Sequence, residues 1–330
     1  MPLRLTSVFN TGYPSGGNDG LLWAGRGAST LVSAGVAFRY GVLSGVLRPE
    51  VTWSQNDWFE TRSNGAAGEL RFGSPYYGAS IDLPQRFGAG PFSTAALGDS
   101  VLRLDWKGVA LGVSNERMWW GPGLENALVL SDNAPGFPHA FLGTSRPVDV
   151  WIGKVEATAF WGRLDRTEYF ADATDPLIVG LALDYAPRWI PGLTVGLGRT
   201  FLQPWDGREA MDYVPFLQSF WKKDLESWHG EGGDNPEDNQ LASLWWRWVF
   251  PKAGLELYGE WGREDHDWSV YKFIEDFDHT QAYLLGLQKV FPLSARRFVR
   301  LHVEVVDLQE ARPPDSERGM PTWYTHGNDL

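Results

Sequence analysis

The feature of this sequence that most constrains its fold is an alternation of apolar and polar side chains with a period of two. Between residues 101 and 106, Leu102 and Leu104 fall on one face of an extended chain, and Arg103 and Asp105 fall on the other. This period is typical of β-strands that meet an apolar medium on one face only. The same pattern predicts strands at 27–40, 43–55, 66–73, 101–106, 109–113, 153–164, 177–186, 193–202, 241–250, 255–261, 279–291 and 298–306. We therefore expect an all-β fold.

The connections between these strands alternate between short and long. Short ones include the turn residues Tyr40-Gly41 and Lys107-Gly108, and others lie at 186–192, 251–254 and 291–297. Long polar ones lie at about 55–65, 114–150, 165–176, 203–240, 264–278 and from 308 onward. Bacterial outer-membrane barrels have short periplasmic turns and long external loops. The pattern predicts an antiparallel up-and-down transmembrane β-barrel, with a soluble sandwich as the alternative.

Membrane energetics assign the two faces of the predicted sheet. An Arg or Lys side chain that faces lipid at the middle of the bilayer costs roughly 2–4 kcal/mol, so charged side chains should face a wet or salt-bridged interior. These are Arg39, Arg48, Glu69, Arg71, Arg103, Asp105, Glu156, Arg247, Glu256, Glu260, Arg300 and Glu304. Leu102, Leu104, Leu255, Val299 and Val303 should be exposed on the convex side of one curved sheet. Aromatic residues near strand ends should lie at the lipid interface: Trp53, Trp58, Trp161, Tyr185, Trp189, Trp205, Trp248 and Tyr283.

Composition excludes several classes of protein. A net charge of −12 argues against a nucleic-acid partner, and the absence of cysteine among 330 residues excludes thiol catalysis, disulfides and thiolate metal sites. No run approaches the 18 apolar residues that a transmembrane helix requires, so a membrane protein must here cross with strands. The N-terminal Met1-Pro2-Leu3-Arg4 lacks the apolar stretch of a signal peptide. We expect either a protein that stays inside the cell or a chain that begins after its signal peptide.

The largest connection, residues 203–240, contains apolar side chains at helical spacing between Asp212 and Trp228. We expect a short amphipathic helix in a long external loop that caps the barrel rim. The alternative is a binding surface for a neutral or cation-bridged polysaccharide.

A motif in the second long connection resembles a known family. Trp119-Trp120-Gly121-Pro122-Gly123, followed by Leu130-Ser131-Asp132-Asn133-Ala134-Pro135, is similar to the signature of the Wzi family of capsule assembly proteins, although Asp132 stands where that family usually has Asn. Asn10-Thr11-Gly12-Tyr13-Pro14 and Tyr324-Thr325-His326-Gly327 resemble further family regions. The resemblance covers nearly the whole chain and is most specific over 115–164.

This resemblance implies an outer-membrane barrel at the surface of a Gram-negative bacterium that helps to hold capsular polysaccharide there. The family's barrel has more strands than we predict here, and the chain ends on the polar Asn328-Asp329-Leu330. Open sheet edges are not tolerated in lipid, so we expect residues 1–330 to be one barrel domain that lacks its C-terminal strands. Expected partners are capsular or other exopolysaccharide and outer-membrane lipid or lipopolysaccharide, with the protein a monomer.

Residues 115–150 contain four Pro and four Gly and are predicted to form a plug-like segment. In one interpretation Glu116, Arg117, Trp119, Trp120 and Asn133 bind polysaccharide, because aromatic rings stack on sugar faces while charges and amides bond hydroxyls. In the other the segment is only structural, held in the lumen by tryptophan packing. Both predict that residues 119–140 fold into or across the barrel mouth, with Asn133 or Asp132 bonded to inward charged side chains.

Catalytic patterns are weak in this sequence. It contains no GxGxxG, P-loop or HExxH motif, and the acidic cluster at 260–267 lacks the spacing of a calcium loop. We expect no catalytic residues, no metal and no cofactor. A porin-like diffusion channel is the main alternative to a polysaccharide-associating surface protein. A third possibility is an outer-membrane hydrolase, which requires a buried carboxylate pair or a Ser–His contact in a cleft.

Overall fold

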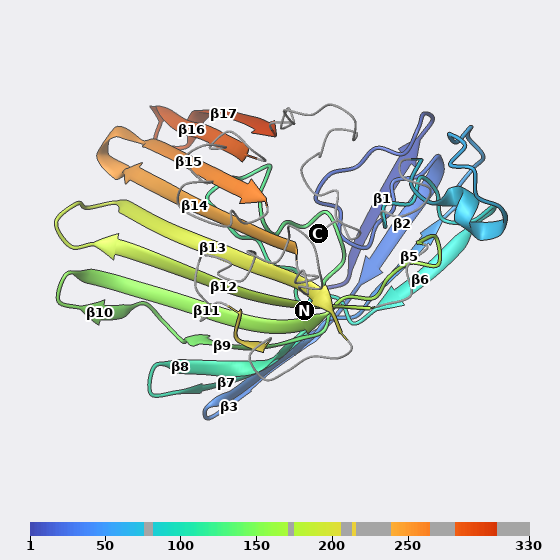
Figure 1. Cartoon of the computed structure of the whole chain (residues 1–330). Coiled ribbons are helices and arrows are strands. Elements are labelled where there is room, and N and C mark those ends of the chain that lie inside the picture. The colour runs from blue at the N-terminus through green and yellow to red at the C-terminus, as the bar shows by residue number, and fades with distance from the viewer. Residues whose placement is uncertain (76–81, 171–174, 206–212, 216–238, 265–280, 309–330) are drawn as a thin grey trace, which may run out of the picture.

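The computed structural model describes residues 1–75, 82–170, 175–205, 213–215, 239–264 and 281–308, which are mostly antiparallel β-structure (Figure 1). The strands are β1 (Arg4–Asn10), β2 (Gly27–Ser33), β3 (Val36–Tyr40), β4 (Leu43–Leu47), β5 (Glu50–Ser54), β6 (Phe92–Ala96), β7 (Val101–Trp106), β8 (Val109–Ser114), β9 (His139–Thr144), β10 (Val148–Val150), β11 (Gly153–Arg163), β12 (Pro176–Pro187), β13 (Leu193–Pro204), β14 (Asn239–Phe250), β15 (Leu255–Glu264), β16 (Gln281–Ser294) and β17 (Arg297–Leu308). The 3-10 helices η1 (Gly68–Phe72) and η6 (Pro251–Ala253) join them. The all-β, antiparallel prediction is confirmed.

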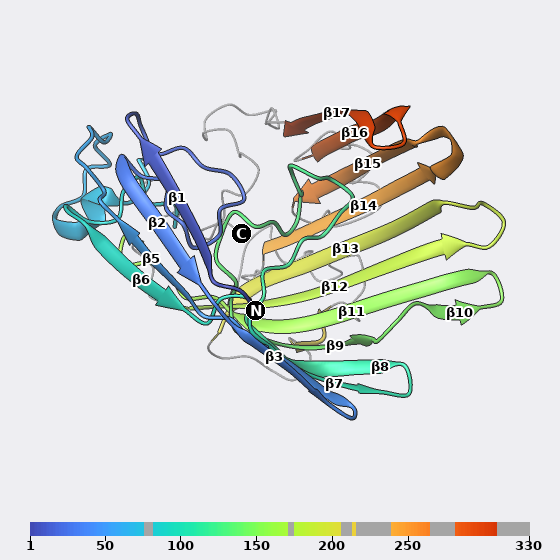
Figure 2. The same cartoon turned by 180° about the vertical axis from the view of Figure 1, so that it is seen from behind.

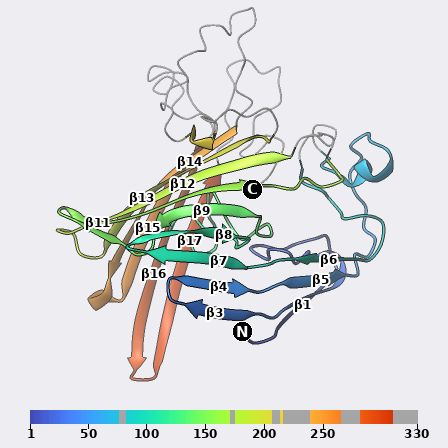
Figure 3. The ribbon, with the colours of Figure 1, turned by 90° about the horizontal axis from the view of Figure 1, so that it is seen from below.

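The strands form one long sheet and one small sheet. The long sheet has thirteen strands in the order β17-β16-β15-β14-β13-β12-β11-β9-β8-β7-β4-β3, with β10 also paired to β11, and the small one has the order β1-β2-β5-β6. The long sheet, which we call the wall, curves around a concave face without closing on itself (Figure 3). Its tight turns gather at one end, and the long connection of residues 115–138 leaves from the other (Figure 1). This arrangement confirms the alternation predicted from the sequence.

Three strand pairs continue from one sheet into the other across a common break. The chain passes from β2 to β3 through Ala34-Gly35, from β4 to β5 through Arg48-Pro49, and from β6 to β7 through residues 97–100. Pro49 has no N–H to give to a ladder, and a Cβ on Gly35 would lie 2.5 Å from the carbonyl oxygen of Leu47. The sequence predicted unbroken strands at 27–40 and 43–55, and it missed this break. The small sheet therefore leans away from the wall as an extension of it (Figure 2).

The register of the wall places the two predicted sets of side chains on opposite faces, and the predicted exposure of the convex set is confirmed in part. On the convex face Leu102, Val299 and Val303 are exposed, whereas Leu104 and Leu255 are half-buried. The small sheet lies beside the convex face of the wall and does not cover it (Figures 1 and 2). On the concave side the alternating charged residues are Arg103, Asp105, Glu256, Glu260, Arg300 and Glu304, of which Glu260 is buried and Arg300 exposed. A sandwich with apolar side chains packed between two sheets does not fit these exposures.

Exposed aromatic residues gather at the tight-turn end of the wall. Trp151 and Trp189 are 81% and 64% exposed, and their rings make an edge-on contact with centroids 6.2 Å apart. Tyr40 and Trp106, on neighbouring turns, are also exposed. Amphipathic rings at this level are typical of the lipid interface.

The interior is not uniformly wet, which corrects one expectation. Phe160, Ile178, Leu241 and Leu284 point to the concave side and are almost fully buried there. Trp245 also points inward, where its indole Nε1 donates to Asp184 Oδ1 at 2.9 Å. These inward positions are apolar because a segment of the chain folds over them. The alternation of apolar and polar residues in the strands does not predict such a covering segment.

Several boundaries also differ from expectation. The predicted strand 66–73 is wrong, because Gly68–Phe72 forms the 3-10 helix η1 in the connection between β5 and β6. Glu69 and Arg71 therefore do not belong to the wall. Strands β1, β6, β9 and β10 were missed, since their apolar runs are short. The motif at 324–327 lies outside the described residues, and so does the predicted helix at 212–228 apart from residues 213–215. Within the described part of the chain, no helix is long and apolar enough to span a bilayer.

Candidate functional site

The segment between β8 and β9, residues 115–138, leaves the wall and folds over its concave face (Figure 1). We call it the plug. It is shorter than the predicted 115–150, because 139–144 and 148–150 are strands. Asn115 anchors its start, with its backbone N–H donating to Ser100 O at 2.8 Å and its Nδ2 to Gly98 O and Gly136 O. The plug thus begins at the break between β6 and β7.

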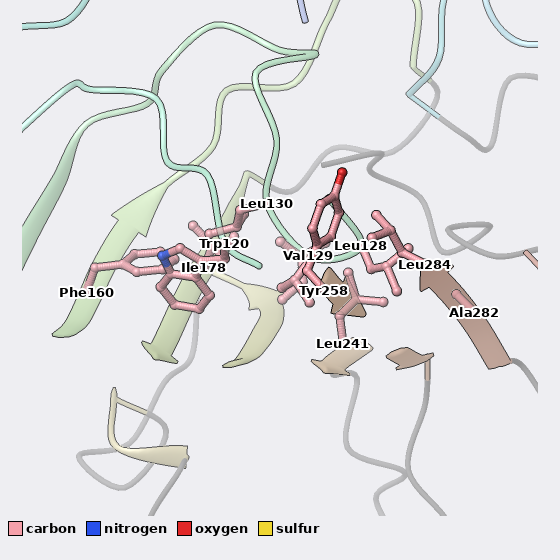
Figure 4. Packing of buried hydrophobic residues seen from close by; sticks show 11 residues of the cluster. Trp120, Leu128, Val129, Leu130, Phe160, Ile178, Leu241, Tyr258, Ala282 and Leu284 are labelled. Carbon is pink, nitrogen blue, oxygen red and sulfur yellow. The ribbon is translucent and has the colours of Figure 1, made fainter. Parts of the chain in front are cut away.

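One side of the plug packs into an apolar cluster on the wall (Figure 4). The ring of Trp120 meets Phe160 edge-on at a centroid distance of 5.3 Å. A Cβ on Gly180 of β12 would lie 2.8 Å from the Trp120 ring, and one on Gly198 of β13 would lie 3.2 Å from it. These two glycines leave the space that the indole fills. Leu128, Val129 and Leu130 complete the cluster against side chains of β12, β14, β15 and β16.

The tip of the plug is held by one carboxylate of the last described strand. Glu304 on β17 accepts hydrogen bonds from the backbone N–H groups of Leu124 at 2.8 Å, Glu125 at 3.2 Å and Asn126 at 2.9 Å, and from Asn126 Nδ2 at 2.9 Å. The hydroxyl of Tyr258 donates to the same carboxylate at 2.7 Å. Successive N–H groups that converge on one anion form a strong, directional contact. We call this contact the latch.

A second inward carboxylate lies under the plug in a different environment. Glu260 on β15 is 3% exposed and forms no ion pair with another described residue; the hydrogen-bonding groups near its carboxylate are the Ser243 side chain and the backbone of Leu128. A Cβ on Gly121, which has a φ of +109°, would lie 2.4 Å from Glu260 Oε2. Only glycine combines this conformation with so close an approach.

The other side of the plug borders a cavity of about 570 Å³ on the concave face of the wall. Its walls come from β4, β7, β8, β9 and β11, from the start of the plug, and from Met1. The polar and aromatic lining residues are Arg48, Asp99, Arg103, Ser114, Glu116, Arg117, Asp132, His139, Phe141, Thr144 and Thr158. Pockets of this size hold small ligands or short oligomers.

An ion-pair network forms the floor of the cavity at the break. Arg117 donates from Nε and Nη2 to the two oxygens of Asp99 at 3.1 and 2.7 Å, and Arg48 donates to Asp99 Oδ2 at 3.0 Å. Burial alone would raise the pKa of Asp99, but the bonds and charge of Arg117, helped by Arg48, outweigh it and hold that pKa below its ordinary value. The bond to Asp99 in turn raises the pKa of Arg117. Both side chains are therefore charged at neutral pH.

The structure separates the five residues that the sequence proposed as one site. Glu116 and Arg117 line the cavity. Trp120 is buried in the apolar cluster, and Trp119 donates from its indole Nε1 to Gly123 O at 2.9 Å within the plug. Asn133 Oδ1 accepts from the backbone N–H of Asn18 at 2.9 Å. The five residues therefore do not converge on one ligand position.

The prediction for residues 119–140 is confirmed in part. The plug does fold over the concave face, as predicted. However, Asn133 bonds the N-terminal segment instead of a charged side chain of the wall, and Asp132 lies near Arg117 of the plug itself. The charged side chain that holds the plug is Glu304, which accepts hydrogen bonds from backbone N–H groups of the plug. Every residue except proline has such a group, so the sequence does not indicate this contact.

The sequence also missed Asp99, which has the greatest number of arginine contacts in the cavity. It lies in a short polar connection between two strands that were not both recognised. A carboxylate two positions before a strand, near Arg48 in the break between β4 and β5, could have indicated it. Among the residues that the structure describes, no three His, Asp or Glu side chains are grouped to hold a metal ion.

The chain is similar to known proteins over most of its length. The sequence profile of the family described as "Capsule assembly protein Wzi" matches residues 20–329. Among solved structures, the Escherichia coli protein Wzi, described as an outer membrane protein involved in group 1 capsule assembly and as a carbohydrate-binding β-barrel, is similar with a TM-score of 0.55 and 16% identity, covering 92% of this chain and 56% of that one. The chain thus spans little more than half the length of that structure.

Two further structures show weaker similarity. OccK10 (OpdN) of Pseudomonas aeruginosa has a TM-score of 0.36 and 14% identity over 92% of this chain and 91% of that one. Salmonella typhi OmpF in complex with daunomycin has a TM-score of 0.36 and 9% identity over 94% and 89%. No curated protein matches the chain in sequence.

Proposed function

The chain belongs to the Wzi capsule assembly family, and on that basis we propose that it is a non-enzymatic outer-membrane protein that holds capsular or other exopolysaccharide at the surface of a Gram-negative cell. The observation that supports this most is the cavity beside the plug, because Glu116 and Arg117 of the signature region contribute to its lining. The polysaccharide would bind there by a short stretch of sugar units.

The chemistry of the lining suits a sugar. Glu116 and Asp132 offer acceptors to hydroxyl groups, while Thr144 and Thr158 offer hydroxyls of their own. Phe141 contributes an aromatic face, on which the C–H face of a pyranose ring can pack. A sugar ring has hydroxyls at its edge and an apolar C–H face. It therefore binds where hydrogen-bonding groups lie beside an apolar surface.

The wall supports a location in the outer membrane. Its convex side exposes apolar side chains such as Leu102 and Val303 to the surrounding medium, and its exposed aromatic residues gather at one level. This face would contact outer-membrane lipid. A monomer remains our expectation.

A diffusion channel is the second candidate, and the plug opposes it. The apolar cluster and the latch fix the plug over the concave face at two separate places. Recordings in planar bilayers distinguish the two functions: we expect no steady open conductance, and a stable open channel would contradict our proposal.

The direct test is retention of polysaccharide on cells that carry variants of the cavity. Glu116→Gln and Thr158→Val should lower retention while leaving the surface level of the protein unchanged. Glu156→Gln is the matched control, since Glu156 is an exposed carboxylate of β11 that does not line the cavity. If the cavity variants and the control retain equal amounts of polysaccharide, the cavity is not the binding site.

A further inference from the structure

The turns at the tight end of the wall carry charge of one sign. They comprise residues 41–42, 107–108, 145–147, 151–152, 188–192, 251–254 and 295–296. Their charged side chains, all of them exposed, are Lys107, Arg146, Arg188, Lys252 and Arg296, and the same turns contain no Asp or Glu. The chain as a whole has 41 Asp and Glu against 29 Lys and Arg, so its composition does not explain this excess of cations. We call these turns the basic end.

Exposed aromatic side chains accompany the cations of the basic end. At three turns a cation and an exposed aromatic residue are neighbours in the sequence: Arg39-Tyr40, Trp106-Lys107 and Arg188-Trp189. The register of β3, β4 and β7 places Tyr40 and Trp106 on the convex face with Leu104. This combination suits the polar boundary of a bilayer, where a ring lies against the acyl chains and a cation reaches the headgroups.

Backbone hydrogen bonds join neighbouring turns of the basic end. The backbone N–H of Ser145 donates to Gly108 O at 2.9 Å, and that of Arg188 donates to Ile152 O at 3.0 Å. These bonds pair the β7–β8 turn with the β9–β10 turn, and the β10–β11 turn with the β12–β13 turn (Figure 1). The cations of these turns therefore act together on one area of the surface.

Few carboxylates oppose these cations. Asp149 of β10 is exposed beside the basic end. Asp105 and Glu256, near the ends of β7 and β15, already accept hydrogen bonds from Arg103 at 2.9 Å and Arg247 at 2.7 Å. Among the described residues, none of the five turn cations forms an ion pair. Their charge is therefore available to an anion from outside the protein.

From this arrangement we propose that the basic end binds the phosphate headgroups of anionic phospholipids in the membrane that surrounds the wall. This rests on the lipid contact proposed above and adds the class of lipid. Short turns of outer-membrane barrels lie on the periplasmic side, so the lipid is that of the inner leaflet. Clustered Lys and Arg are attracted to an anionic lipid surface. The exposed rings favour a bilayer over a soluble anion, because they gain from contact with acyl chains.

Quenching of tryptophan fluorescence by brominated lipids measures this preference. The full chain would be reconstituted in phosphatidylcholine bilayers with increasing fractions of brominated phosphatidylcholine or brominated phosphatidylglycerol, both with the same acyl chains. The part of the signal that a Trp151→Phe, Trp189→Phe double variant lacks reports on lipid at the basic end. At low salt, we expect this part to give a roughly threefold or larger association constant for phosphatidylglycerol relative to phosphatidylcholine. In about 1 M NaCl, where the screening length is about 3 Å, the ratio should fall toward one.

A variant assigns the preference to the basic end. It neutralises three neighbouring turns through Lys107→Gln, Arg146→Gln and Arg188→Gln, and it should bring the ratio close to one. The matched control removes as many exposed cations elsewhere, on β1 and in the β5–β6 connection, through Arg4→Gln, Arg62→Gln and Arg71→Gln. The control should keep the full preference, because its cations lie away from the basic end.

Equal association of the two lipids at low salt would overturn the proposal, and so would a ratio that salt does not change or an equal loss of preference in the control. In each of these cases, quenching by phosphatidylcholine still reports contact of the wall with lipid, so the lipid contact stands. If neither lipid quenches the fluorescence, the lipid contact and the proposal fail together. The salt response needs no charge-neutralising variant, so it tests the proposal even if the triple variant does not fold.

Discussion

The two sides of the plug meet the same wall in opposite ways. Toward β11–β16 the contact is dry, with Trp120 and three consecutive apolar residues buried among inward side chains. Toward β4, β7, β8 and β9 the contact is polar and leaves a cavity of about 570 Å³ above an arginine–aspartate network. The first side has no room for a ligand, and the second has room and unpaired acceptors. The difference indicates that one segment both anchors itself and shapes the proposed binding site, with separate residues for each task.

The largest effect should come from the dry side. Trp120→Ala empties a site whose neighbours Gly180 and Gly198 have no side chains that could fill it, so we expect a loss of roughly 3–5 kcal/mol of stability. Thermal unfolding in detergent measures this loss. The control is Trp119→Ala, which removes a half-buried ring and one hydrogen bond and should cost clearly less. Equal losses would show that the two tryptophans do not differ in role.

The latch should have the next largest effect. Glu304→Gln replaces a charged acceptor of several N–H bonds by a neutral one, and such bonds contribute about 1.5–3 kcal/mol when charged. Amide hydrogen exchange at Leu124, Glu125 and Asn126 should speed up, because these N–H groups donate to Glu304. Unchanged exchange there would mean that the apolar cluster alone holds the tip.

Glu260 should respond in the opposite direction to the same substitution. Its carboxylate is 3% exposed and has no cationic partner among the described residues, and burial of a charged carboxylate costs more than burial of a neutral amide of the same size. Glu260→Gln should therefore slow amide exchange in the plug and raise the unfolding temperature. A loss of stability comparable to that of Glu304→Gln would show that Glu260 also supports the plug.

The smallest effect should come from acid on the polar side. The depressed pKa of Asp99 means that its ion pairs contribute stability above the ordinary pKa of 3.8, and that this contribution is lost as pH falls through the lower pKa of the folded state. Protection of the backbone N–H of Asn115 should fall with acid in this range. In Asp99→Asn the same amide should be less protected at neutral pH and should lose less of its protection on acidification. An identical acid response in both proteins would contradict the assigned role of Asp99.

Local patterns in the sequence were sufficient for most of the wall, although β9 and β10 were not predicted. Alternation in β7, β15 and β17 is set by which side chains meet lipid, so it can be read residue by residue. The same reasoning failed for Gly68–Phe72, where a few alternating residues form a 3-10 helix. Pro49 indicates the break between β4 and β5. The break was not predicted, because the residues on both sides of Pro49 are extended and look like one continuous strand.

The site could be predicted only in part. Glu116 and Arg117 were identified because the signature motif drew attention to them, and they do line the cavity. Trp120 was grouped with them by proximity in sequence, but successive residues of the plug point to different sides. Asp99 and Glu304 act through partners 18 and 180 positions away, and no local pattern contains that information. Whether polysaccharide binds in the cavity stays a prediction.

The latch has a consequence for the order of assembly. Leu124 and Glu304 are 180 positions apart, and contacts between such distant residues form late because a long loop must close first. While β9 to β16 are being added to the growing sheet, the tip of the plug has no acceptor for its N–H groups. The concave face can therefore stay accessible until β17 is in place. Sealing of the tip would then mark the moment at which this part of the protein is complete.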